Sequence, residues 1–259
     1  THQGNLSISD AWEISVKTKL PDGDTIYWCT AHKSPPYTTK RHIIGFKTPG
    51  GLCYETRDIL RMKNLCEQFV YGWAVGADPL YLPENFGIPL NENGLPEYFL
   101  LEVHYDNPKM LSNLNYETGI IAYTTTDIRE HDAGILRVGH ITSASLMIPP
   151  GTSNYVITGH CSGICTQNRF PNDGINVFTV FLHSHLAGRK MRLRQFRNGT
   201  ELPWLANDNH YDFNFQQNRL LSEYRKILKG DHLTYECTDE SISRDPPQAT
   251  LNGTTILIF

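Results

Sequence analysis

The chain has 259 residues, with 23 Lys and Arg against 27 Asp and Glu, so its net charge of −4 provides no broad basic field for nucleic acid. Apolar residues make up 39% of the sequence, and no run of them approaches the roughly 18 residues that a membrane-spanning helix needs. Thr, Ser, Asn, Gly, Pro and Tyr are frequent and suit strands and turns, which disfavours both disorder and a helical bundle.

Short strands between turn signals follow one another along the chain. The alternating and apolar segments predict strands at 25–29, 98–105, 119–126, 175–186, 192–206, 232–237 and 254–259, with a hairpin about Asn198 and Gly199. The best helical window, residues 56–69, has unevenly spaced apolar residues and predicts only a short helix. The spacing of the strands predicts an all-β sandwich or barrel.

A polar stretch at 126–134 separates two strand-rich halves of the chain. We therefore predict an N-terminal domain at 12–128 and a C-terminal domain at 129–259. The chain does not open with a basic segment followed by an apolar one, so we expect any signal peptide to lie outside this piece.

The cysteines and the glycosylation sequons indicate an oxidising compartment of the secretory pathway. The cysteines are not spaced as the paired knuckles of a zinc site and stand at positions 29, 53, 66, 161, 165 and 237. The Asn-x-Ser/Thr sequons are candidate glycosylation sites and stand at Asn5, Asn198 and Asn252.

His183 and His185 are the strongest candidate metal ligands in the sequence. Residues two apart on a strand point to the same face, so both imidazoles are expected to lie side by side. Their strand is apolar at both parities and is expected to be buried on both faces, where two adjacent imidazoles without a cation are costly. The spacing alone is equally consistent with two histidines of no special role at the end of a strand.

His104 ends another apolar strand, on the same face as Leu100 and Glu102. Taken alone, it is more typical of a hydrogen-bonded core histidine than of a ligand. Imidazole ligands without a cysteine cluster suit copper, zinc or non-haem iron, and the ligand type does not choose among them. A zinc hydrolase or lyase with three histidines at one site is therefore a further hypothesis. The remaining histidines are expected in surface or turn positions, and they are His2, His32, His131, His140, His160, His210 and His232.

Several long motifs resemble the copper type II, ascorbate-dependent monooxygenases, especially their dopamine β-monooxygenase-like (monooxygenase X) group. The resemblance runs from about residue 12 to about residue 237 and includes LPDGDTIYWC, YGWAVGADPLYLPENFGIPL, YFLLEVHYDNP, DIREHDAGILRVG, TGHCSGICT and VFLHSHLAGRKMRLRQFRNG. It implies two jelly-roll β-sandwich domains that face each other across a cleft, with one copper in each. It also implies ascorbate as the reductant, and dioxygen and a small molecule as substrates.

The resemblance assigns roles to matching residues. His104 in EVHY takes the place of a ligand of the electron-storing copper, and His183 and His185 take the places of ligands of the oxygen-activating copper. Peptide-amidating relatives carry an Arg where this chain has Phe181, so the resemblance implies a small, aromatic amine-like substrate rather than a peptide.

The sequence departs from the family at both copper sites. Relatives carry an adjacent His-His pair in the segment that corresponds to the stretch between His42 and Cys53, and a Met ligand in an EMC motif beyond the position of Cys237, and this sequence shows neither. We interpret these departures as contiguous segments lost by splicing, by gene prediction or by truncation of the record. The alternative is a non-catalytic secreted relative, or an inactive splice or truncation product, that keeps the fold but not both coppers.

The resemblance also bears on the cysteines. In relatives, the counterpart of Cys29 is bridged to a cysteine that resembles Cys53, which predicts that disulfide here. In relatives, the disulfide partners of the other cysteines lie in the segments that are missing here. A local disulfide between Cys161 and Cys165 is the alternative for that pair.

Overall fold

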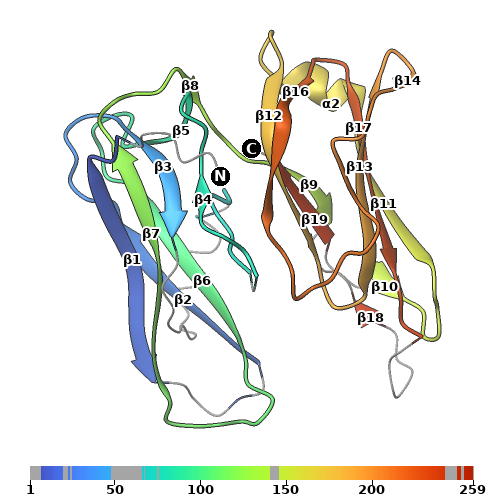
Figure 1. Cartoon of the computed structure of the whole chain (residues 1–259), viewed down its shortest axis with the longest axis horizontal. Coiled ribbons are helices and arrows are strands. Elements are labelled where there is room, and N and C mark those ends of the chain that lie inside the picture. Colours follow the sequence, from blue (N-terminus) through green and yellow to red (C-terminus); the bar gives the residue numbers. More distant parts are fainter. Residues whose placement is uncertain are drawn as a thin grey trace. The chain divides into compact units, whose positions relative to one another are not determined.

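The computed structural model describes residues 7–19, 23, 25–47, 66, 68–74, 76–140, 146–242, 250–251 and 254–258. Strands dominate this part of the chain, so the predicted all-β class is confirmed (Figure 1). The chain divides into two compact units, the first made of Thr1–Gly72 and Pro79–Gly134 and the second of Trp73–Asp78 and Ile135–Phe259. No helix in the described ranges is long and apolar enough to cross a membrane.

The first unit is built from a large sheet and a two-stranded sheet. The large sheet has the order β1 (Asp10–Lys19), β7 (Asn115–Thr125), β3 (Arg41–Lys47), β5 (Phe86–Leu90) and β8 (His131–Asp132), with β4 (Leu80–Tyr81) paired to β3. The smaller sheet pairs β2 (Thr25–Lys33) with β6 (Tyr98–Asp106). Strands β2, β6 and β7 confirm the predictions at 25–29, 98–105 and 119–126.

The core of the first unit lies between these sheets. Its buried side chains come from β1, β3, β5, β6 and β7, and they are Trp12, Ile14, Ile43, Leu90, Leu101 and Ala122. Trp12 meets Phe99 of β6 edge to face, with ring centroids 5.2 Å apart. The apolar parity of β6 therefore faces the large sheet, which leaves the alternate residues Glu102 and His104 on the opposite face.

The second unit is a sandwich of two larger sheets with a short pair of strands beside them (Figure 1). One sheet has the order β11 (Tyr155–Cys161), β17 (His232–Asp239), β13 (Gly188–Arg197) and β14 (Thr200–Glu201), with β15 (Ala206–Asp208) paired to β13. The other has the order β16 (Asn218–Ile227), β12 (Ile175–Ser184), β19 (Thr254–Ile258) and β9 (Leu136–His140). The short pair is β10 (Met147–Ile148) with β18 (Thr250–Leu251).

Both sheets of the sandwich contribute side chains to one core, which includes Val177, Leu182, Leu193, Leu233 and Tyr235. The predicted hairpin about Asn198 and Gly199 is confirmed, because Arg197 pairs with Thr200 and both turn residues have positive φ values of 50° and 78°. Two positive φ values are typical of a type I′ turn, for which Asn-Gly is a preferred sequence.

The one helix of the described part, α2 (Gly163–Arg169), was not predicted from the sequence. Ser162 caps it by accepting a hydrogen bond from the Cys165 backbone N–H. The Thr166 hydroxyl donates to the Asp231 carbonyl at 2.7 Å and so ties the helix to the turn before β17. The helix predicted at 56–69 falls almost entirely outside the described residues.

The Asp231 carboxylate joins this turn to β13. It accepts hydrogen bonds from the Leu228 N–H, from the Gln195 amide at 2.7 Å, and from both Nε and Nη2 of Arg197 at 2.8 and 2.7 Å. Burial raises the pKa of Asp231, but these donors together outweigh burial and hold the pKa below its usual range. The carboxylate is therefore buried, ionised and fully partnered.

His42, on the middle strand β3 of the large sheet, is a buried histidine with a fixed tautomer. Its Nδ1 accepts from the Arg129 N–H at 3.0 Å, so the proton sits on Nε2, which donates to Asp132 at 2.8 Å. Burial lowers the pKa of His42, and the Asp132 carboxylate offsets this only in part. The imidazole is therefore neutral at pH 7.

We expect the free energy of unfolding to decrease as the pH is lowered below about 6.5, the usual pKa of histidine. The unfolded chain then binds a proton at His42, whereas the folded chain resists it, so the folded state loses stability until its own lower pKa is passed. Urea unfolding at pH 7.5 and pH 5.5 measures this loss. His42→Gln is expected to reduce it, and His131→Gln, at a half-exposed position on β8, is the matched control.

Candidate metal centre

The centre is built at the end of β12, whose residues Val177 to Leu182 are buried at both parities. This confirms the expected burial on both faces of the strand. His183 and His185 lie where β12 ends and a turn begins. The turn is closed by a 2.9 Å hydrogen bond from the Gly188 N–H to the His185 carbonyl. The rings of His183 and His185 lie side by side, with centroids 5.4 Å apart and planes at 77°.

Gln216 fixes the orientation and the tautomer of His183. Its buried side-chain amide donates through Nε2 to the Phe213 carbonyl at 2.8 Å, which directs Oε1 towards His183. His183 Nδ1 lies 2.7 Å from this oxygen and must carry the proton, because an amide oxygen can only accept. The lone pair of His183 is therefore on Nε2, which makes this nitrogen the atom that could bind a metal. This arrangement matches the usual outer support of metal-ligating histidines.

Tyr211 holds the backbone between the two histidines. Its hydroxyl donates to the Ser184 carbonyl at 2.5 Å and accepts from the Ser184 N–H at 2.8 Å. Burial raises the pKa of Tyr211 well above its usual value, so the phenol stays protonated and keeps both bonds. These two hydrogen bonds fix the backbone at Ser184 and therefore the spacing of the His183 and His185 side chains.

Gly188 permits this close packing. A Cβ at this position would lie 2.5 Å from Ser184 Oγ and 3.2 Å from the Tyr211 ring. The glycine of the LHSHLAG motif is therefore required by the approach of β13 to the end of β12.

A segment distant in the sequence supports the loop that carries Gln216. Residues Trp73–Asp78 belong to the second unit, and Gly76 adopts a φ of 88° there. A Cβ on Gly76 would lie 3.1 Å from the Asn214 carbonyl oxygen. The YGWAVGADPL motif thus contacts the loop immediately before Gln216.

His104 lies elsewhere, on β6 of the first unit. Its side chain is 58% exposed, and its Nε2 lies 3.0 Å from the Glu102 carboxylate. Cys29, opposite Glu102 on β2, directs its sulfur to the same carboxylate at 3.6 Å. In the described ranges, no group of at least three His, Cys, Asp or Glu side chains is placed to hold a metal.

The donor sets of the two regions fit copper to different degrees. At the end of β12, two adjacent imidazoles, one held by Gln216 with its lone pair on Nε2, provide nitrogen donors that suit copper. The described surroundings of His104 supply a single imidazole, which does not by itself make a copper site. Relatives carry the His-His pair in the stretch that corresponds to residues 43–52, of which residues 48–52 lie outside the described residues.

The cysteine and glycosylation predictions remain predictions. Cys53, Asn5 and Asn252 lie outside the described residues, and no disulfide joins two residues inside them. Asn198 is exposed in its turn. Burial, together with a hydrogen bond to Cys165, raises the pKa of Cys161 to about 11, so the Cys161 side chain is a thiol at neutral pH.

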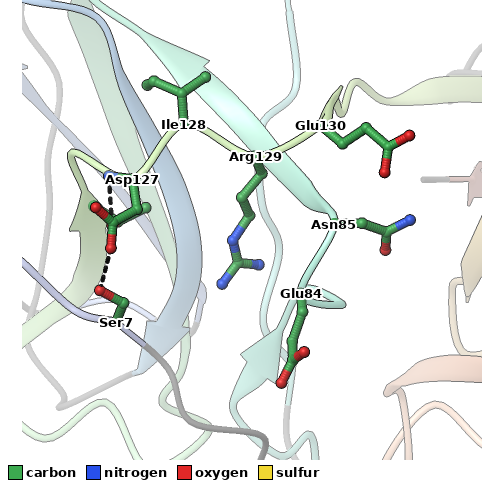
Figure 2. Close-up of a pocket in the computed structure, with 8 residues that line it drawn as sticks. Ser7, Glu84, Asn85, Asp127, Ile128, Arg129 and Glu130 are labelled. Carbon is green, nitrogen blue, oxygen red and sulfur yellow. Dashed lines mark hydrogen bonds between the residues drawn. The ribbon is translucent and has the colours of Figure 1, made fainter.

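The first unit also contains an open pocket of about 550 Å³, lined by Ser7, Glu84, Asn85, Thr125, Asp127, Ile128, Arg129 and Glu130 (Figure 2). Figure 2 shows Arg129 projecting from the segment between Ile128 and Glu130. Its guanidinium donates to the carbonyls of Leu82, Pro83 and Phe86 at 2.7 to 3.2 Å. Arg129 therefore braces a turn, and no predicted metal ligand lines this pocket.

Gln216 and Tyr211 were missed by the sequence reasoning. Both lie in the segment NHYDFNFQQ (209–217) between β15 and β16, which has no periodicity and no motif spacing of its own. The only available signal was the aromatic and amide content of an otherwise polar loop.

We expect Gln216→Leu to weaken copper binding at His183 and His185 by about 10- to 100-fold, the usual cost of removing an outer partner of a ligand. Without the acceptor, His183 loses its fixed tautomer and orientation. Competition with a chromophoric Cu(I) chelator measures the affinity. Gln217→Leu, at the exposed neighbouring position, is the matched control, and equal affinities of the two variants would contradict the assigned role.

Comparisons with known proteins extend over most of the chain. The profile of the copper type II ascorbate-dependent monooxygenase N-terminal domain matches residues 45–112, and the profile of the C-terminal domain matches residues 131–257. Human DBH-like monooxygenase protein 1 is 35% identical over 255 residues, covering 86% of this chain and 41% of the relative. Human dopamine beta-hydroxylase is 32% identical over 278 residues, covering 96% and 45%. Drosophila melanogaster MOXD1 homolog 1 is 31% identical over 276 residues, covering 91% and 39%. The chain thus spans less than half the length of these relatives.

Proposed function

Because the chain belongs to the copper type II ascorbate-dependent monooxygenase family, we propose that it binds copper through His183 and His185 and hydroxylates a substrate C–H bond with dioxygen. Copper and ascorbate are the family's metal and reductant. The observation that carries the proposal is the pair of adjacent imidazoles at the end of β12, one of them fixed by Gln216.

Each supporting residue has a defined task in this proposal. Gln216 keeps the proton of His183 on Nδ1, which leaves Nε2 as the donor atom. Tyr211 and Gly188 hold the backbone at Ser184, so the spacing of the donors is set before a metal arrives. Bound copper supplies one-electron redox chemistry and the activation of dioxygen.

Phe181 supports a small, aromatic amine-like substrate. It lies on β12 two residues before His183, where the peptide-amidating relatives carry Arg, and its side chain is buried. This position therefore offers no guanidinium for a peptide carboxylate.

We propose His104 as a ligand of the electron-storing copper, in line with the EVHY motif. Its Nε2 approaches Glu102, which can orient the ring for coordination through the other nitrogen. Further ligands must come from residues beyond those that surround it in the described structure.

We further propose a domain boundary near residues 128–129. We also propose that the protein occupies the secretory pathway. The exposed Asn198 sequon agrees with an oxidising compartment, in which the proposed Cys29–Cys53 disulfide would be stable.

A second candidate function is a non-catalytic relative that binds copper without turnover. It is favoured by the surroundings of His104, which supply one imidazole among the described residues. An electron-storing site with a single histidine would not retain copper well enough for repeated turnover.

An oxygen-uptake assay tests the two candidates. The chain, loaded with copper and supplied with ascorbate and catalase, is incubated with a phenylethylamine-type substrate or a glycine-extended peptide. We expect oxygen consumption coupled to a hydroxylated amine and little product from the peptide. Copper binding without coupled oxygen consumption would contradict the enzyme and support the non-catalytic relative.

A further inference from the structure

A second pair of histidines meets on the outer face of the β11–β17 sheet. His160 pairs with Thr234 across the two antiparallel strands, so His232, two residues before Thr234, lies on the same face. Ile157 on β11 and Tyr235 on β17 are buried in the core. His160 has the opposite parity to Ile157 on β11, so it lies on the solvent side of the sheet. The two rings have centroids 5.3 Å apart, close to the 5.4 Å between His183 and His185.

The distance between the facing nitrogens fits a shared metal ion. His160 Nδ1 lies 3.2 Å from His232 Nε2. Two imidazole nitrogens that each bind one ion at about 2.0 to 2.1 Å, with an angle of roughly 90° to 110° at the metal, lie about 2.8 to 3.4 Å apart. The 3.2 Å contact, a hydrogen bond between the two rings, therefore has the nitrogen separation that one shared ion requires once the bridging proton is displaced.

The surroundings of the pair tolerate a cation. The guanidinium of Arg194, on the neighbouring strand β13, donates to Glu201 at 2.7 Å and to Glu236 at 2.5 Å, so its charge is balanced. Thr234 Oγ1 lies 3.1 Å from His160 Nδ1 and adds an oxygen at the site. The Phe196 ring meets the His232 ring edge on, with 6.1 Å between the centroids.

We propose that His160 and His232 form a two-imidazole site for a divalent transition-metal cation such as Zn²⁺. The site is on a different sheet from His183 and His185, and the proposal goes beyond the monooxygenase function. Water would complete the coordination, since the described residues supply no third His, Cys, Asp or Glu ligand. A bound ion would link β11 to β17. A measured copper-to-protein ratio would then include any copper ion bound at this site.

Zn²⁺ titration of the metal-free chain by calorimetry tests the proposal. We expect the number of bound Zn²⁺ ions to fall by one in His160→Gln and in His232→Gln, and the Zn²⁺-induced rise in unfolding temperature to shrink in both. Unchanged stoichiometry in these two variants would overturn the proposal.

A matched variant separates this site from the proposed copper centre. His183→Gln/His185→Gln is expected to keep the Zn²⁺ ion that His160→Gln removes. If this double variant does not fold, His210→Gln, at an exposed turn, serves as the control that must leave the stoichiometry unchanged. Loss of the same ion in the double variant or in His210→Gln would contradict the assignment.

Discussion

His183→Gln and His185→Gln are each expected to lower the affinity of the β12 site for Cu(I) by more than about 100-fold and to abolish ascorbate-dependent hydroxylation. Loss of a direct ligand exceeds the 10- to 100-fold cost of losing an outer partner. The effect is expected to be this large because the neighbouring imidazole alone cannot retain the ion. Chelator competition and the oxygen-uptake assay measure the two effects.

The matched control for these variants is His210→Gln, which removes an exposed histidine from the turn after β15. It is expected to leave affinity and turnover unchanged. The measurements are made in the His160→Gln/His232→Gln background, so that an ion on the β11–β17 sheet does not mask the loss. Full activity in either His183→Gln or His185→Gln would contradict the proposed centre.

Asp231→Ala is expected to destabilise the second unit by about 3 kcal/mol, the lower range for removing one partner of a buried ion pair. The change leaves the Leu228 N–H and the Gln195 amide without their acceptor and Arg197 without its counter-charge. With a urea m-value of about 1 to 3 kcal/mol/M, the unfolding midpoint should fall by roughly 1 M or more. Asp173→Ala, at an exposed turn, is the control and should leave the midpoint within about 0.3 M.

The same carboxylate predicts a dependence on acid. Its folded pKa is held below the unfolded value of about 3.9, so its stabilising effect is complete above that pH. The contribution is lost as the pH falls through the folded pKa, because the folded chain must then take up a proton that breaks the network. Asp231→Ala should therefore unfold with a flatter pH profile than the unaltered chain below pH 4, and parallel profiles would contradict this account.

The fold elements with a strong local signal were predictable from the sequence. The apolar run before His183 indicated a strand buried on both faces, and the Asn198-Gly199 pair indicated a two-residue hairpin turn. In both cases the residues that determine the structure are adjacent in the chain. The spacing of His183 and His185 likewise predicted rings on one face.

The partners that make the site depend on contacts that cross the fold. Gln216 reaches His183 from 33 residues away, and Tyr211 reaches Ser184 from 27 residues away, both out of an irregular loop. No local periodicity encodes such contacts. For the same reason the pairing of His160 with His232, 72 residues apart, could not be predicted when both were assigned to surface or turn positions.

Helix α2 was missed for a different reason. It has only seven residues, and its stability rests on the Ser162 cap and on the bond from Thr166 to the Asp231 carbonyl rather than on an apolar stripe. The burial of His42 likewise depends on tertiary contacts, because Asp132 and the Arg129 backbone, 90 and 87 residues away in the sequence, satisfy its two ring nitrogens.

X-ray absorption of the chain loaded with one equivalent of Cu(I), in the His160→Gln/His232→Gln background, tests the central claim most directly. Coordination by His183 and His185 predicts imidazole scattering from two nitrogen ligands. It also predicts that this scattering is lost or halved in His183→Gln and weakened in Gln216→Leu. Imidazole scattering of unchanged intensity in His183→Gln and in His185→Gln would show that copper binds elsewhere and would contradict the account.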